Sequence, residues 1–211
     1  MKTDDLIRSL ALDSAPRLPL ARALLYGFLP GVAVSLVFYA LAIGLRPHLF
    51  DLLPNWRIFF KIGFPIAVFA CAGPLALQLA RPRGDPRPLV FILIGLLIVL
   101  AAAVVTELVI LPPDLWRVRL IGHNARVCMM LIPLMSAAPL VGALIALHRG
   151  APQNPGLAGA GAGLFAGAFA AALYATHCPD DSPLFVATWY TLAVLIVMLV
   201  GALAGSRWLR W

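Results

Sequence analysis

Six long apolar runs dominate the chain, and short polar connectors separate them. The runs lie near residues 24–45, 58–80, 89–111, 127–148, 157–175 and 185–205. A helix needs about 20 apolar residues to cross roughly 30 Å of hydrocarbon, so each run is long enough to span a bilayer. Because the runs and their connectors use nearly all of the 211 residues, we predict an all-α membrane protein. Residues 23–211 are expected to form a single bundle of six transmembrane helices.

Composition supports this fold class. Hydrophobic residues make up 62% of the chain and charged residues 12%, with a mean hydropathy of +0.95, far outside the range of soluble domains. The net charge is +7, but no basic stripe with interleaved aromatic residues occurs, so we expect no direct nucleic acid binding. The positive charge instead indicates attraction to an anionic lipid bilayer.

The distribution of lysine and arginine predicts the orientation, because these residues favour the cytoplasmic loops. With the N-terminus inside, the inner side holds ten of the sixteen: Lys2, Arg8, Arg17, Arg22, Arg81, Arg83, Arg87, Arg149, Arg207 and Arg210. Both termini are therefore expected in the cytoplasm. The first run is also too long for the apolar region of a signal peptide.

Residues 1–22 form the one segment that resembles soluble protein. Acidic residues suit the positive end of a helix dipole, and an apolar stripe at helical spacing follows them: Asp4, Asp5, Leu6, Ile7 and Leu10. We predict a short amphipathic helix in the cytoplasm. An isolated helix of this length is marginal in water, so it needs a partner, which is the bilayer surface, its own bundle or another protein.

A polar loop, HCPDDSP at residues 177–183, lies between the fifth and sixth runs. It places Cys178 on the predicted outer side, at a depth similar to that of Cys128 at the start of the fourth run. Two such cysteines in an oxidising compartment can pair if their Cα atoms come within about 4.4–6.8 Å. The alternative is two small buried apolar residues, since no CxxC motif or metal-ligand spacing occurs.

Other polar residues near these cysteines favour a role in sensing. Nitrogen and oxygen ligands beside thiols suit a thiophilic metal ion, and an oxidant could instead link the two sulfurs. The candidate sensing residues are Cys128, Cys178, His177, Asp180 and Asp181. The candidate metal ligands are Cys128, Cys178, His177 and His123.

Three further patterns concern the spans themselves. Lys61 and Glu107 lie near the outer ends of their runs, where they are expected to pair with each other or, in the case of Lys61, to extend outward to water. Cys71 lies mid-span and is interpreted as a packing residue. Small residues recur every four positions, which favours close helix contact: Gly159, Gly163 and Gly167, then Gly201 and Gly205.

The chain resembles the NrsF-like family of six-helix bacterial inner-membrane anti-sigma factors in three segments: MKTDDLIRSLA, CMMLIPLMSAAPL, and THCPDDSPLFVATWY at residues 176–190. The resemblance implies a protein that sequesters an extracytoplasmic-function sigma factor at the inner membrane and releases it under stress. It implies sigma binding by the N-terminal segment and signal response by the outward-facing pair Cys128 and Cys178. It implies no enzyme activity and no cofactor.

We therefore expect residues Asp4, Asp5, Leu6, Ile7 and Leu10 to contact the sigma factor. Two alternatives stay open. A membrane thiol oxidoreductase would exchange a disulfide with a quinone or another substrate, although it usually needs a nearby resolving thiol. A small transporter would need polar groups at mid-membrane, whereas the ionisable residues crowd one end. The oligomeric state stays open as well, because glycine faces serve contacts within and between chains.

Overall fold

The computed structural model describes residues 18–210. Six helices within this range are long and apolar enough to cross a membrane, as the sequence predicts, and the range contains no strand. Five connectors of different lengths join these helices. The long helices are α2 (Leu20–Ala42), α4 (Trp56–Leu79), α5 (Arg87–Ile110), α7 (Ala125–Leu147), α8 (Pro155–Ala175) and α10 (Thr191–Trp208). The expected N-terminal amphipathic helix lies outside the described residues.

Four short elements lie at one end of the bundle: α3 (Leu49–Leu52), α6 (Pro113–Ile121), α9 (Pro183–Phe185) and the π-helical η1 (Val186–Tyr190). Helix α6 runs directly into α7 through a turn at Gly122, whose φ of 60° is a left-handed conformation that suits glycine. The connector expected between the third and fourth spans is thus largely helical.

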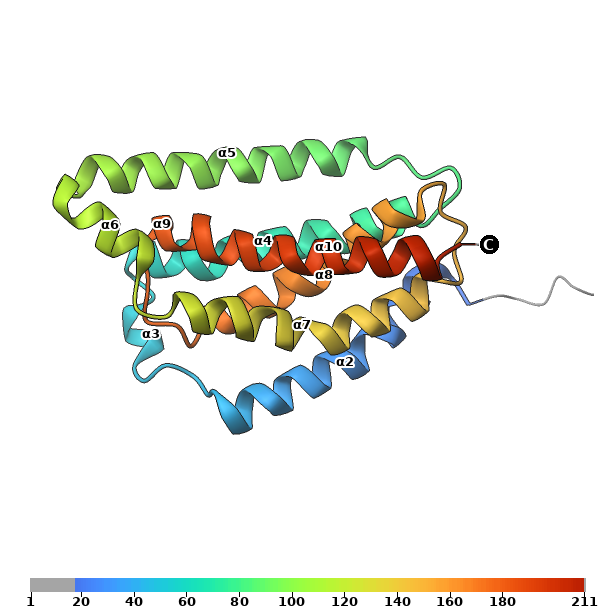
Figure 1. Ribbon diagram of the computed structural model, residues 1–211, viewed down its shortest axis with the longest axis horizontal. Helices are drawn as coiled ribbons and strands as arrows, with labels where there is room; N and C mark the ends of the chain where they lie inside the picture. The colour runs from blue at the N-terminus through green and yellow to red at the C-terminus, as the bar shows by residue number, and fades with distance from the viewer. Residues whose placement is uncertain (1–17, 211) are drawn as a thin grey trace, which may run out of the picture.

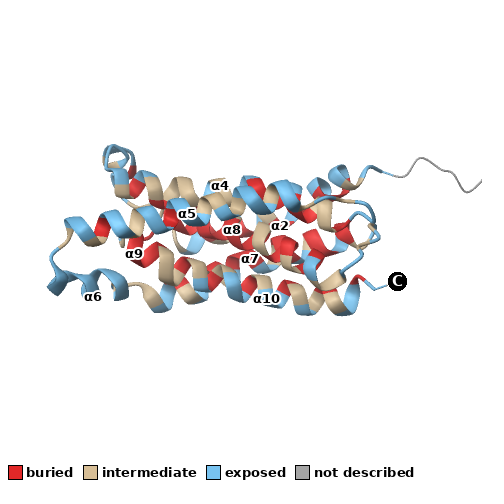
Figure 2. Ribbon diagram, turned by 90° about the horizontal axis from the view of Figure 1, so that it is seen from above, coloured by how far each residue is buried: buried red, intermediate tan, exposed pale blue. Residues whose placement is uncertain are grey.

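Helix α8 forms the centre of the bundle and α5 its margin (Figures 1 and 2). In its most hydrophobic window, 61% of α8 is buried, against 6% of α5. Helix α8 packs against α10, α4 and α7, whereas α2 packs along α7, and α5 packs along α4. The outer position of α5 leaves most of its apolar surface exposed.

The expected close contact between glycine-bearing helices is confirmed for α8 and α10. A Cβ atom added at Gly159 would lie 2.1 Å from the carbonyl oxygen of Gly201, and one added at Gly201 would lie 2.4 Å from the carbonyl oxygen of Gly159. Only glycine allows backbones to approach this closely. A similar contact joins α2 to α7 at Gly27 and Gly142.

Two hydrophobic cores follow each other along the bundle. The first, which we name the alanine core, combines small residues such as Ala76, Ala158 and Ala162 with a group of phenylalanine rings that meet Phe28 in stacked, tilted and edge-to-face arrangements. The second, the cysteine core, contains Cys128, Cys178, Tyr174, Phe185 and Tyr190. The cysteine core lies at the end of the bundle that carries α3, α6 and α9, which we name the cysteine end.

Candidate functional site

The loop between α8 and α9 is tied to several helices at the cysteine end. Thr176 and Tyr39 of α2 share a hydrogen bond of 2.5 Å between their hydroxyl oxygens. Nδ1 of His177 donates to the carbonyl oxygen of Gly44 at 3.0 Å. These contacts attach the start of the loop to the end of α2 and the connector that follows it.

Asp181 holds the loop to α4 through a buried cation. Nζ of Lys61 lies 2.8 Å from Asp181 Oδ1 and also donates to the backbone carbonyl of Cys178. Lys61 is only 1% exposed, so these two oxygen atoms take the place of water around its ammonium group. Arg46 adds a second ion pair to Asp181 at 2.9 Å. The carboxylate thus bridges two cations from different parts of the chain.

The expected pair of Lys61 and Glu107 is wrong, and so is the alternative in which Lys61 extends to water. Glu107 instead pairs with Arg57, whose Nε lies 2.8 Å from Oε2, and it accepts a hydrogen bond from Ser182 Oγ at 3.3 Å. Arg57 and Lys61 lie one helical turn apart on α4 and therefore share a face. Each of these two cations has its own carboxylate.

Asp180 attaches the same loop to the beginning of α7. Its carboxylate accepts hydrogen bonds from the backbone N–H groups of His123, at 3.1 Å, and Asn124, at 2.9 Å. The imidazole of His123 lies 3.6 Å from it. Cys128 lies in the first turn of α7. Asp180 therefore joins the loop that carries Cys178 to the segment that carries Cys128, whereas Asp181 joins the same loop to Lys61 and Arg46.

The structure brings Cys128 and Cys178 into one buried cluster as free thiols. Both are 0% exposed. Burial raises the pKa of the Cys178 thiol, an effect that the nearby ammonium of Lys61 opposes. The expected common location of the two cysteines is confirmed, whereas their pairing stays a prediction.

Two tyrosines of the cysteine core went unnoticed in the sequence. Tyr174 and Tyr190 pack with Cys128 and Cys178 in this core, and neither tyrosine hydroxyl has a hydrogen-bond partner of ordinary geometry among the described residues. A buried hydroxyl without a partner is unfavourable. The available sequence signal was a tyrosine within a few residues of each end of the polar loop.

The candidate metal ligands do not assemble into a ready site. His123 is exposed and His177 is bonded to a backbone carbonyl. Across residues 18–210, no three histidine, cysteine or acidic side chains form a group that could hold a metal ion. Cys71 lies apart in α4, where its thiol donates to the carbonyl oxygen of Leu89 at 3.5 Å.

The candidate sigma-binding residues, Asp4, Asp5, Leu6, Ile7 and Leu10, lie outside the described residues. The fold and the cysteine end together define the class: a bundle of six helices of membrane-spanning length, with a polar, thiol-bearing cluster at one end.

Comparison with known proteins identifies the family. A family model described as "Negative regulator of sigma F" matches residues 10–211. The chain is 36% identical, over 219 aligned residues and the full length of both proteins, to the "Anti-sigma-F factor NrsF" of Caulobacter vibrioides. It is 34% identical over 216 residues, again at full length, to the "Probable anti-sigma-F factor NrsF" of Azospira oryzae. No solved structure matches. The chain belongs to the NrsF family of anti-sigma-F factors.

Proposed function

We propose that this chain is a membrane-bound anti-sigma factor that holds an extracytoplasmic-function sigma factor through residues 1–22. Release would follow oxidation of Cys128 and Cys178. The family membership supports a regulatory role toward a sigma factor and no enzyme activity. Both termini would lie in the bacterial cytoplasm and the cysteine end in the periplasm, in keeping with the distribution of lysine and arginine.

The observation that carries the sensing proposal is the burial of both thiols in one core, directly beside the loop that joins several helices. A disulfide requires Cα atoms about 4.4–6.8 Å apart and a defined dihedral angle. Forming it would restrain the loop at Cys178 against the first turn of α7. Lys61 donates to the carbonyl of Cys178, so the buried ion pair with Asp181 would have to adjust with it.

A route from this loop to the other end of the bundle exists along α8. This helix precedes the loop directly and packs against α10, α4 and α7 over its length. To shift the sigma-bound fraction from about 99% to 1%, oxidation must favour the released state by about 5.5 kcal/mol. A new covalent cross-link is of the right order, since disulfides typically contribute about 2–4 kcal/mol, and altered packing can add to it.

The test of the whole proposal is a pull-down of the detergent-solubilised protein from its native host, with and without a thiol oxidant. A sigma factor identified by mass spectrometry in the reduced sample and lost from the oxidised one is the expected result. If no sigma factor co-purifies under either condition, the proposed partner is wrong.

Two sets of variants separate binding from sensing. Replacing Leu6 and Leu10 together by Asp should abolish sigma capture, whereas Arg8→Gln, on the opposite side of the predicted helix, should not. Cys128→Ser and Cys178→Ser should each retain the sigma factor after oxidation. Cys71→Ser is the matched control and should release it normally. Release from both Cys128→Ser and Cys178→Ser would return the two thiols to a packing role.

A further inference from the structure

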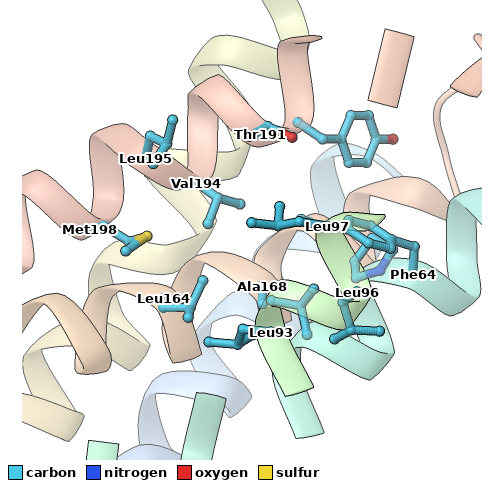
Figure 3. Close-up of a pocket in the computed structure, with 14 residues that line it drawn as sticks. Phe64, Leu93, Leu96, Leu97, Leu164, Ala168, Thr191, Val194, Leu195 and Met198 are labelled. Carbon is cyan, nitrogen blue, oxygen red and sulfur yellow. The ribbon is translucent and has the colours of Figure 1, made fainter. Parts of the chain in front are cut away.

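An apolar pocket of about 240 Å³ lies among α4, α5, α8 and the segment η1–α10 (Figure 3). Its wall has almost no polar surface, and side chains of α5 and α10 face each other across it. Two lining residues carry hydroxyl groups. Thr191 donates to the carbonyl oxygen of Val186, and the hydroxyl oxygen of Tyr190 is buried. The pocket therefore offers no hydrogen-bonding group to an occupant.

The pocket runs parallel to the helices that line it. On α10 and η1 it extends from Tyr190 to Met198, and on α8 from Leu164 to Ala171. At 1.5 Å per helical residue, these stretches are about 12 Å and 10 Å long. Over this length, the volume corresponds to a mean cross-section of about 20 Å². A helix about 10 Å across has a cross-section of roughly 80 Å², so the pocket excludes a helix and suits a single hydrocarbon chain.

The volume sets the length of chain that fits. A cavity of about 150 Å³ lined by Leu, Ile and Phe holds benzene, which has six carbon atoms. By the same ratio, the pocket accommodates about ten carbon atoms. This is a large part of one acyl chain of a bilayer lipid.

The pocket opens on the outside of the bundle, between α5 and α10. Leu97 of α5 and Leu195 of α10 line it and are more than half exposed, whereas Ala168 and Ala171 of α8 are at most 2% exposed. Helix α5 packs along α4 but makes little contact with α8 or α10, and Figure 1 shows it set apart from the other helices. In the proposed membrane location, this opening faces lipid.

The chemistry of the wall selects among molecules that dissolve in a bilayer. A carbonyl or hydroxyl group in this pocket would lose its hydrogen bonds without gaining others, which is unfavourable. An acyl chain has no polar atom beyond its ester, and its methylene groups gain dispersion contacts with the lining side chains. The surrounding bilayer also presents such chains at high concentration.

We propose that this pocket binds one acyl chain of a bilayer phospholipid, which fills the space between α5 and the rest of the bundle. The chain packs against Leu93, Leu97 and Val194, and the head group stays outside the pocket. Ala171 and Tyr190 belong both to the pocket wall and to the cysteine core, so the bound chain supports one side of that core. This inference rests on the proposed membrane location and is independent of the sensing role of the thiols.

The test uses the full-length protein in nanodiscs of phosphatidylcholine, a small share of which carries a diazirine in the middle of one acyl chain. After illumination, mass spectrometry locates the attached lipid. We expect attachment within residues 164–171 of α8, a stretch that contains no exposed residue. Leu199, which is exposed on α10 outside the pocket, reports contact with the surrounding lipid. Attachment near Leu199 with none in residues 164–171 would overturn the inference.

Two variants and a matched control address the pocket. Val194→Phe fills it from α10, and Leu97→Trp closes its opening from α5; each should lower the attachment within residues 164–171 at least fivefold. Ile98→Trp adds the same bulk at the neighbouring residue of α5, which is exposed and lies outside the pocket, and should leave the attachment unchanged. Wild-type attachment in both pocket variants would contradict the proposed site.

Thermal unfolding in detergent separates binding of the chain from binding of the head group. A ligand that binds the folded state raises the unfolding temperature. Phosphatidylcholine and phosphatidylglycerol with the same chains should raise it equally in the wild type, and both should have a smaller effect on Val194→Phe. A response to phosphatidylglycerol alone would mean that surface arginines bind the head group, and the inference would fail.

The nanodisc experiment also separates this inference from the proposed function. If the chain does not enter nanodiscs, the proposed membrane location is wrong and the inference fails with it. If the chain enters them and Leu199 is labelled but residues 164–171 are not, only the inference fails. The sigma-factor pull-down is then unaffected.

Discussion

The two halves of the bundle differ in what holds their helices together. Every ion pair between described residues lies at the cysteine end. The alanine core of the other half relies on small residues, a phenylalanine group and backbone contacts such as the one between Gly159 and Gly201. In the proposed membrane location lipid offers apolar surroundings to any helix, so close packing rather than hydrophobicity would supply the attraction there.

This difference indicates which half of the bundle can change its conformation. Close contact between backbones leaves little freedom, since the helices must separate before they can slide. The cysteine end instead places the buried Lys61, the partly exposed Arg57, their carboxylate partners and two thiols around one loop. Thiols and ion pairs of this kind have a chemistry that can be altered. Helices α7, α8 and α10 run through both halves and connect the polar end to the closely packed one.

The largest effect is expected from Asp181→Asn. This change removes the carboxylate that pairs with Lys61 and Arg46 and leaves a cation that is 1% exposed without its counter-charge. Loss of one partner of a buried pair typically destabilises a protein by about 3–5 kcal/mol. The free energy of unfolding, measured by denaturant titration in detergent micelles, should fall by about that amount.

Asp51→Asn is the matched control for this prediction. It removes the same charge from a pair with His48 at the same end, but both side chains there are at least 80% exposed. Surface changes of this kind usually fall within about 0.5 kcal/mol. Equal effects of the two substitutions would show that the cysteine end gains no stability from its buried ion pairs.

The next effect concerns the other half of the comparison. Gly159→Ala places a Cβ atom against the backbone of α10, so α8 and α10 must move apart, at a cost of about 1–3 kcal/mol. Gly95→Ala in α5 has no neighbour within 4 Å of the added atom and should stabilise its helix by up to about 1 kcal/mol. Thermal unfolding of the two variants in one detergent gives the comparison, and a loss at Gly95 as large as that at Gly159 contradicts it.

The six long helices and the close glycine contact could be predicted, because both depend on local patterns of apolar and small residues. The partner of Lys61 could not. Arg57 and Lys61 lie on one face of α4, one turn apart, so the position of α4 along its axis relative to α5 decides which cation meets Glu107. The sequence placed Lys61 and Glu107 only a few residues inside the ends of their runs, which does not resolve a difference of one turn.

Helix α6 was missed for a different reason. It lacks an apolar stripe, so hydrophobic periodicity does not reveal it. Its limits are nevertheless marked by Pro113 at the first position, Asp114 in the first turn, Arg119 in the last and Gly122 after it, a familiar set of helix start and stop signals. The place of Tyr190 in the same core as Cys128 and Cys178 depends on tertiary packing, which the sequence pattern does not contain.

The raised pKa of Cys178 predicts a slow reaction with iodoacetamide, because only the thiolate reacts. In a background of Cys71→Ser and Cys128→Ser, the alkylation rate of the folded protein should climb with pH to a midpoint above that of the unfolded chain. At pH 8.5 we expect a lower rate in the folded protein than in the unfolded chain, because burial raises the pKa of the Cys178 thiol. Coincident pH profiles would show that burial has no effect on this thiol.

The same shift has a consequence for stability. The folded state keeps the Cys178 proton to a higher pH than the unfolded state, so the stabilisation is complete below the unfolded pKa. It is lost as the pH rises through the folded pKa. In the same background, the free energy of unfolding should therefore fall between these two values. Replacing Cys178 by Ser should remove that part of the pH dependence.

The smallest effect on stability, and the sharpest test of the comparison, comes from one anchoring side chain in each half. Asp180→Ala removes the acceptor for the backbone N–H groups of His123 and Asn124 at the cysteine end. Asn154→Ala removes the N-cap that accepts from the N–H of Leu157 at the start of α8. Each should lower the free energy of unfolding by about 1 kcal/mol.

Their effects on the thiols should differ, because only Asp180 connects the cysteine loop to the α7 segment that carries Cys128. Without this link the loop opens more often, so Asp180→Ala should speed the oxidation of Cys128 and Cys178 by diamide several-fold. Asn154→Ala should leave that rate unchanged despite a similar loss of stability. Equal acceleration in both variants would mean that unfolding of the whole bundle exposes the thiols. The cysteine end would then not open independently of the half that contains the alanine core.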